Sequence, residues 1–304
     1  MNEARYRETE RRLWAHAGIT PSEQRVRLAG SGTMVRVQEV GAGPPVLFIH
    51  GSPNSGSTWA PVVPHFHGFR CLIVDRPGTG LSEDHQLTRG IEPAADRFVG
   101  DLLDALDVPQ AHIVASSFGG FLALRSAAAT PERISRMVQM SCPPFVAGMT
   151  VPPFMQGLTN PFVRWLVPKL PPTTGYNRKV LRELGHAASL DRGRIPEIFH
   201  DWYLALQRDT HLMRNEIPMI AATLSGTGID PATALDAAVL SRVQAATLFL
   251  WGEADGFGGP AVARGVVDAM PHATLELFAG FGHLPWMDDP SLIGGKAAAF
   301  LRGA

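Results

Sequence analysis

The sequence predicts an α/β fold, with a mostly parallel eight-stranded sheet, helices on both faces and an all-helical cap inserted after the sixth strand. Three observations lead to this prediction. Short, continuous apolar runs recur and end in turn residues, as strands covered on both faces do. A helical apolar pattern separates two of these runs. The alternation of strand-like and helix-like segments stops after Pro143-Pro144 and resumes at residue 246.

The first expected element is a polar helix over residues 3–16, which carries charges of both signs. This stretch has no continuous apolar core, so it fits neither a secretory signal nor a membrane span, and a cytoplasmic protein is expected. Residues 26–40 then alternate apolar and polar positions around a Gly-Ser-Gly turn. That pattern predicts a hairpin with one face in water.

Three apolar runs follow, at residues 44–51, 70–78 and 111–117. Between the last two, Phe98, Leu102 and Leu106 recur four residues apart, on one face of a predicted helix. Alternating strands and helices predict a parallel sheet with right-handed crossovers.

Further strands are expected at 135–142, 246–256 and 273–282, before a last helix that ends at the C-terminus. The stretch between them lacks strand patterns and starts a helix at Asn160-Pro161. We therefore expect two parts of one core, residues 1–144 and 241–304, separated by a helical cap at 145–240. Such an insertion favours a lid over the carboxyl ends of the strands.

Composition restricts the function. The chain has 304 residues, of which 45% are hydrophobic, and a formal net charge of −1. This balance argues against binding to nucleic acid or an anionic membrane surface. Neither the two cysteines, which lie in apolar runs, nor the histidines form a metal motif, so no cofactor is expected and the partner is a small-molecule substrate.

The most informative motif is HIVASSFGG, residues 112–120. A buried strand that passes into a helix there makes a tight turn with Ser117 at its tip, and the crowded backbone explains Ala115, Gly119 and Gly120. This arrangement predicts a nucleophile elbow, with alanine in place of the first glycine. The alternative is that Ser117 is simply a helix N-cap.

A serine nucleophile needs a base and an acid that orients the base, in the chain order serine, acid, histidine. Asp255 and His283 each follow a predicted strand, at the sheet edge that Ser117 also occupies. Other carboxylates compete for the orienting role. They are Glu253, Asp288 and Asp289, and we favour Asp255, because that role requires a buried carboxylate.

An oxyanion intermediate also needs two N–H donors. Phe118, directly after the nucleophile, supplies one, and Ser52, in the loop after the first parallel strand, supplies the other. His50 in the same loop is interpreted as a residue that stabilises the turn.

The blocks FIHGSPNSGSTW, DRPGTGLS, ASSFGG, LWGEAD and GFGHLPW together resemble the α/β-hydrolase superfamily, in its capped branch of serine esterases and C–C hydrolases. The resemblance covers the chain from about Val26 onward. It implies Ser117 as nucleophile, His283 as general base, Asp255 as orienting acid, and Ser52 and Phe118 as oxyanion donors. Haloalkane dehalogenases and epoxide hydrolases are also similar but place aspartate where Ser117 stands, which disfavours an alkyl-enzyme mechanism.

We expect a serine hydrolase that cleaves a small to medium carboxylic ester or lactone through an acyl-enzyme. The first alternative is a C–C bond hydrolase of vinylogous diketones with the same triad. Arg164, Arg178 and Arg182 are then candidate partners of a substrate carboxylate, although the sequence favours them as solvated helix charges. A lesser alternative is a ligand receptor on a hydrolase scaffold. The sequence assigns no oligomeric state.

Overall fold

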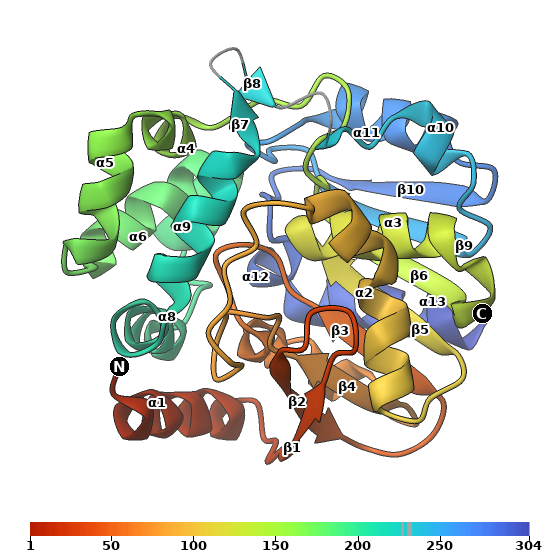
Figure 1. Ribbon diagram of the computed structural model, residues 1–304, viewed down its shortest axis with the longest axis horizontal. Helices are drawn as coiled ribbons and strands as arrows, with labels where there is room; N and C mark the ends of the chain where they lie inside the picture. The colour runs from red at the N-terminus through yellow and green to blue at the C-terminus, as the bar shows by residue number, and fades with distance from the viewer. Residues whose placement is uncertain (226–227, 230–232, 304) are drawn as a thin grey trace.

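The computed structural model describes residues 1–225, 228–229 and 233–303. Its main sheet has eight strands in the order β1-β2-β4-β3-β5-β6-β9-β10 (Figure 1). The strands are β1 (Ser22–Arg27), β2 (Met34–Val40), β3 (Pro45–Ile49), β4 (Arg70–Val74), β5 (Ala111–Ser116), β6 (Ile134–Met140), β9 (Ala246–Gly252) and β10 (Ala273–Phe278). β2 is antiparallel to β1 and β4, and the other neighbours are parallel. The predicted sheet is therefore confirmed.

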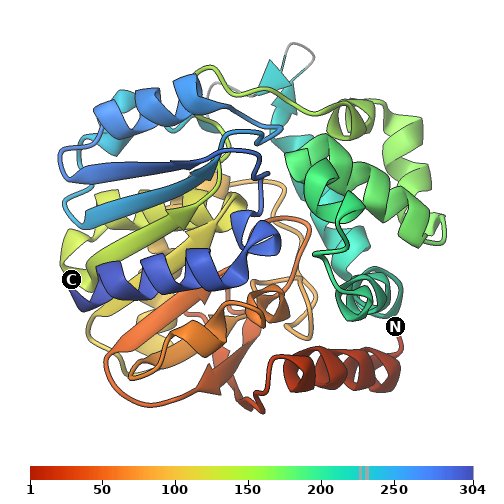
Figure 2. The same ribbon diagram turned by 180° about the vertical axis from the view of Figure 1, so that it is seen from behind.

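Helices cover both faces of this sheet. In β3, Leu47 and Ile49 belong to one hydrophobic cluster and Val46 and Phe48 to the other, so both sets of alternating side chains are buried. The first cluster includes residues of α2 (Ile91–Ala105), α3 (Phe118–Ala129), α10 (Ala237–Leu240) and α11 (Pro260–Asp268). The second includes residues of α12 (Pro285–Asp288) and α13 (Pro290–Arg302), and α13 crosses the sheet in Figure 2. Burial on both faces explains the continuous apolar runs.

The N-terminal helix α1 (Glu3–His16) forms as predicted, and it changes the environment of the hairpin. The β1–β2 hairpin is present, but the expected face in water is wrong for β2, where Arg36 and Gln38 are buried. The physical reason is the carboxylate of Glu10 in α1. Its two oxygens lie 2.6 and 2.7 Å from the Arg36 guanidinium nitrogens, so the arginine charge is paired within the core.

Between β6 and β9 the chain forms a largely helical segment that lies to one side of the sheet (Figure 1). We refer to residues 153–222 of this segment as the cap. Its helices are α4 (Pro153–Gln156), α5 (Pro161–Leu166), α6 (Thr174–Leu181), α7 (Ala187–Asp191), α8 (Glu197–Asp209) and α9 (Leu212–Ala222). Helix α10, which also lies within residues 145–240, packs against α3 of the core (Figure 1). Asn160 caps α5 as expected, since its side chain accepts from two backbone N–H groups. The segment is not entirely helical, because β7 (Leu224–Ser225) and β8 (Gly228–Ile229) pair antiparallel.

Helix α1 also touches the cap. The backbone N–H of Asn2 donates to the carbonyl oxygen of Asp209 at the end of α8 (2.9 Å), and the Arg5 guanidinium pairs with the Asp209 carboxylate. Together with the contact between Glu10 and Arg36, these bonds connect the sheet, α1 and the cap. Among the described residues, no helix has the length and apolar character needed to cross a membrane.

Candidate active site

Ser117 lies at a sharp turn between the end of β5 and the start of α3. Its φ of 50° is in the left-handed region, which a non-glycine residue adopts at a cost of roughly 1–3 kcal/mol. A Cβ atom on Gly119 would lie 2.2 Å from the carbonyl oxygen of Ile49, and one on Gly120 would lie 2.2 Å from the Gln139 side chain. The Ser117 hydroxyl makes no capping hydrogen bond to α3. The geometry therefore fits a nucleophile elbow better than an N-cap.

His283 and Asp255 meet at the same edge of the sheet. The Nδ1 atom of His283 lies 2.9 Å from both carboxylate oxygens of Asp255, and both residues are buried. The carboxylate also accepts from the backbone N–H groups of Cys142 and Phe257, each at 2.9 Å. These donors orient the carboxylate, and we assign the imidazole proton to Nδ1 because Nδ1 faces two acceptor oxygens. Nε2 is then available as a base.

The competing carboxylates lie elsewhere. Glu253 is exposed to solvent. Asp289 caps α13 by accepting from the Leu292 N–H. Asp288 is buried and bonds to His186 and Ser189.

Ser117 and His283 line one cavity of about 190 Å³ beneath the cap. Among the described residues there is no hydrogen bond between their side chains. Catalytic hydrogen bonds are often long without substrate and shorten in the complex, so the shared cavity is the relevant observation.

The predicted oxyanion donors, Ser52 and Phe118, line a small hollow that Ser117 also lines. The backbone hydrogen bonds of the described residues leave the N–H groups of Ser52 and Phe118 without an acceptor. A Cβ atom on Gly51 would lie 2.8 Å from Cβ of Ser117, so glycine allows this loop to approach the elbow closely. Two unpaired N–H groups beside a hydroxyl are suited to stabilise developing negative charge.

His50 supports the loop that carries Ser52. Its Nε2 accepts from the backbone N–H of Arg76 (3.2 Å), so Nδ1 carries the proton and donates to the carbonyl oxygen of Gly51 (2.7 Å). Burial, together with the positive charge of Arg76, holds the pKa of His50 well below its usual value. His50 is therefore neutral and stabilises the turn, as interpreted from the sequence.

Two contacts between the core and the cap were not predicted. The Arg76 guanidinium donates to the carbonyl oxygens of His50 and Gly51, and also to the carboxylate of Glu216 in α9 (2.7 Å). His186 in the cap bonds to Asp288. No local sequence signal could have identified Glu216 or His186, because they lie 140 and 102 residues from their partners along the chain.

The cavity is mainly apolar, and the polar side chains that line it are hydroxyls, amides and the imidazole of His283. None of the described residues that line it is Arg or Lys. The three arginines suggested as partners of a substrate carboxylate are placed elsewhere. Arg178 pairs with Glu197 and Arg182 with Asp191 on exposed surfaces, and Arg164 does not line the cavity.

Comparisons with known proteins agree with this fold. A family model described as alpha/beta hydrolase fold matches residues 44–290. A 2-hydroxy-6-oxo-6-phenylhexa-2,4-dienoate hydrolase of Comamonas testosteroni is 27% identical over 283 residues, which cover 90% of this chain and 92% of the relative. A haloalkane dehalogenase of Mesorhizobium japonicum is 36% identical over 103 residues, which cover 34% of this chain and 33% of the relative.

Solved structures show the same fold at lower identity. A meta-cleavage product hydrolase from Pseudomonas fluorescens superposes with a TM-score of 0.72 at 21% identity, covering 92% of this chain and 97% of the other. The carboxylesterase CesB from Bacillus subtilis superposes with a TM-score of 0.73 at 17% identity, covering 99% of each chain.

Proposed function

Because this chain belongs to the α/β-hydrolase fold family, we propose that it is a serine hydrolase with Ser117, His283 and Asp255 as its catalytic triad. The single observation that carries the proposal is the buried hydrogen bond between Asp255 and His283, whose imidazole lines the same cavity as the elbow serine. An imidazole held in this tautomer presents Nε2 as the base that a serine hydroxyl needs.

The reaction proceeds in two acyl-transfer steps. Ser117 Oγ bonds to the substrate carbonyl carbon while its proton passes to His283 Nε2, and the N–H groups of Ser52 and Phe118 stabilise the oxyanion. Collapse of the intermediate breaks the bond to the leaving group, which takes the proton from His283. Water then attacks the acyl-serine, with His283 again acting as base, and releases the acid.

The preferred substrate is a small to medium ester or lactone whose acyl group is apolar and uncharged. This preference follows from the cavity, which offers no Arg or Lys among the described lining residues. Burying a carboxylate without a cationic partner is costly, whereas an apolar acyl chain gains free energy from burial.

C–C bond hydrolysis is the second candidate, and the names of the relatives favour it over ester hydrolysis. The Comamonas relative is named for a dienoate substrate, which carries a carboxylate. In this chain, such a group would have to bind the uncharged polar side chains of the cavity, among them Asn177 and Gln207, which are hydrogen-bonded to each other at 2.9 Å.

The test compares turnover of p-nitrophenyl esters of increasing chain length with turnover of 2-hydroxy-6-oxo-6-phenylhexa-2,4-dienoate. We expect higher kcat/KM for an ester, and the reverse order would establish the C–C reaction instead. Ser117→Ala should reduce turnover by at least about a thousandfold, and a fluorophosphonate should label Ser117.

The matched control is Ser116→Ala, because the Ser116 hydroxyl is buried without a partner and its removal should leave turnover intact. Full activity of Ser117→Ala would refute both hydrolytic candidates. Binding of these compounds without turnover by the native protein would indicate the ligand receptor.

A further inference from the structure

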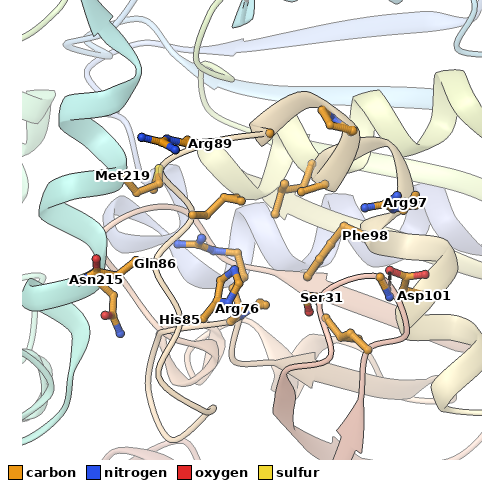
Figure 3. Close-up of a pocket in the computed structure, with 18 of the residues that line it drawn as sticks. Ser31, Arg76, His85, Gln86, Arg89, Arg97, Phe98, Asp101, Asn215 and Met219 are labelled. Atoms are coloured by element: carbon orange, nitrogen blue, oxygen red, sulfur yellow. Dashed lines mark hydrogen bonds between the residues drawn. The ribbon is translucent and has the colours of Figure 1, made fainter.

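A second cavity, larger than the first, lies between the core and the cap helix α9 (Figure 3). Its volume is about 370 Å³, and its walls come from the β1–β2 turn, the loop at residues 76–90, the first part of α2, and α9. We call it the α2–α9 cavity. Phe118 and Met219 line both this cavity and a hollow of about 40 Å³ beside Ser117, so they separate the α2–α9 cavity from the elbow.

Part of the wall of the α2–α9 cavity is apolar. Leu28, Leu87, Phe98 and Leu122 contribute side chains from four different segments, the last of them α3. A volume of this size lies within the range of about 300–1,000 Å³ that small-molecule sites occupy, and apolar walls with a few polar groups are typical of them. The cavity is therefore suited to the apolar body of a small molecule.

The charged groups that line the cavity are predominantly positive. Arg76, Arg89 and Arg97 face two carboxylates, those of Asp101 and Glu216. The Glu216 carboxylate is paired with Arg76. Burial lowers the pKa of the nearby His85, which is therefore neutral at pH 7 and adds no positive charge. An anion is consequently the better electrostatic match.

Arg89 is exposed and has no ion pair among the described residues. Arg97 also lacks an ion pair, but it lies next to Asp101 (Figure 3), whose Oδ2 accepts from the Gly30 N–H. Arg89 instead lies on the α9 side of the cavity, near Met219 (Figure 3). A guanidinium presents paired N–H donors that match a carboxylate.

We propose that the α2–α9 cavity is a second ligand site that binds a small amphipathic organic acid. Its apolar body lies against Leu87, Phe98 and Leu122, and its carboxylate pairs with the Arg89 guanidinium. The site does not depend on the proposed hydrolase activity, because the cavity contains neither Ser117 nor His283.

The site adjoins the oxyanion loop. Arg76 lines the α2–α9 cavity and donates to the carbonyl oxygens of His50 and Gly51, directly before Ser52. Its guanidinium carbon also lies 5.0 Å from the centre of the Phe118 ring. An acid in this cavity therefore lies next to Arg76 and Phe118, which border the elbow. The acid does not occupy the substrate cavity.

The test is calorimetric titration of the full chain with benzoate, phenylacetate, 4-phenylbutyrate and octanoate, and with the amide of whichever acid binds best. We expect at least one acid to bind and its amide to bind at least about fivefold more weakly. Arg89→Gln should weaken binding of the acid by about three- to tenfold. Arg264→Gln is the matched control, since Arg264 is also exposed and lies on α11, away from the cavity.

A second arm separates the two cavities. A protein whose Ser117 carries an alkyl phosphonate should bind the acid with unchanged affinity. Loss of binding there would place the acid in the substrate cavity and overturn the proposal. The proposal is also overturned if no acid binds, if the amide binds as tightly as the acid, or if Arg89→Gln and Arg264→Gln bind the acid with equal affinity. Failure of the phosphonate to label the protein would count against the hydrolase function, while the Arg89 comparison would still decide this site.

Discussion

His186 of the cap and Asp288 of the core form a buried pair, in which His186 Nδ1 lies 3.1 Å from the Asp288 carboxylate. The other ring nitrogen of His186 accepts from the backbone N–H of Leu284 (3.0 Å). The carboxylate also accepts from the Gly282 N–H (2.9 Å), and the His283 N–H donates to the carbonyl oxygen of Leu184 in the cap (2.8 Å). Three successive backbone N–H groups around the proposed base are thus held by Asp288 and the cap.

Asp288→Asn should disturb the position of His283. The carboxylate accepts from three donors, and an amide nitrogen cannot replace an oxygen toward them. We expect kcat to fall about ten- to hundredfold, with a smaller change in KM, because His283 acts on the transition state. Steady-state kinetics on the best ester measures this. Asp268→Asn, at an exposed position in α11, should match the wild type. Equal kcat in both variants would show that Asp288 has no positioning role.

Glu10→Ala should destabilise the protein strongly. Glu10 pairs with the buried Arg36, which also pairs with Asp75, and it accepts from Tyr6 and Ser57. Its removal therefore leaves several buried donors without their acceptor, while Arg36 keeps Asp75 as its counterion. The expected loss in the free energy of unfolding is at least about 2 kcal/mol, measured by urea denaturation. Glu8→Ala on the same helix removes only an exposed ion pair with Arg11 and should leave the unfolding midpoint unchanged. Similar midpoints for the two variants would contradict the role assigned to the Glu10–Arg36 pair.

His50 should make the stability depend on pH. Its pKa is held well below the usual value in the folded protein and returns to about 6.5 on unfolding. Below that pH the unfolded chain binds a proton that the folded protein does not, so the free energy of unfolding decreases as pH falls. The contribution approaches about 1.4 kcal/mol per pH unit and ends at the folded pKa.

Denaturation curves of wild type and His50→Gln between about pH 5 and pH 8 measure this contribution. The variant should show the smaller slope in the acidic range. Other histidines with lowered pKa values, such as His112 and His200, affect both proteins equally. Parallel slopes would mean that His50 is protonated in the folded state as well.

Gly119→Ala should prevent correct formation of the elbow. An added Cβ would lie 2.2 and 2.6 Å from the carbonyl oxygens of Ile49 and His50, which are backbone atoms of β3 and its loop. We expect a loss of stability of at least about 3 kcal/mol, or failure to fold. Gly100→Ala is the control, because no atom lies within 4 Å of its Cβ position in α2. That change should raise stability by up to about 1 kcal/mol, as thermal denaturation would show.

The sequence alone determined the sheet and the positions of the proposed triad along the chain. Continuous apolar runs report burial on both faces, and each of them forms a strand. Asp255 and His283 follow the ends of parallel strands, which meet at one sheet edge, so their pairing follows from strand order. Gly119 and Gly120 are explained by local crowding at the turn.

Only the tertiary structure decided which charged groups are buried and which side chains line the proposed substrate cavity. Arg36 has the alternating pattern of a strand face in water, yet α1 covers it and supplies Glu10. The sequence favoured solvated positions for Arg178 and Arg182 but left the cavity open as an alternative, and the structure places both in exposed ion pairs. The periodicity of apolar residues indicates which side of a helix or strand is buried. It does not indicate which distant element covers that side, because this depends on how the cap and the core pack against each other.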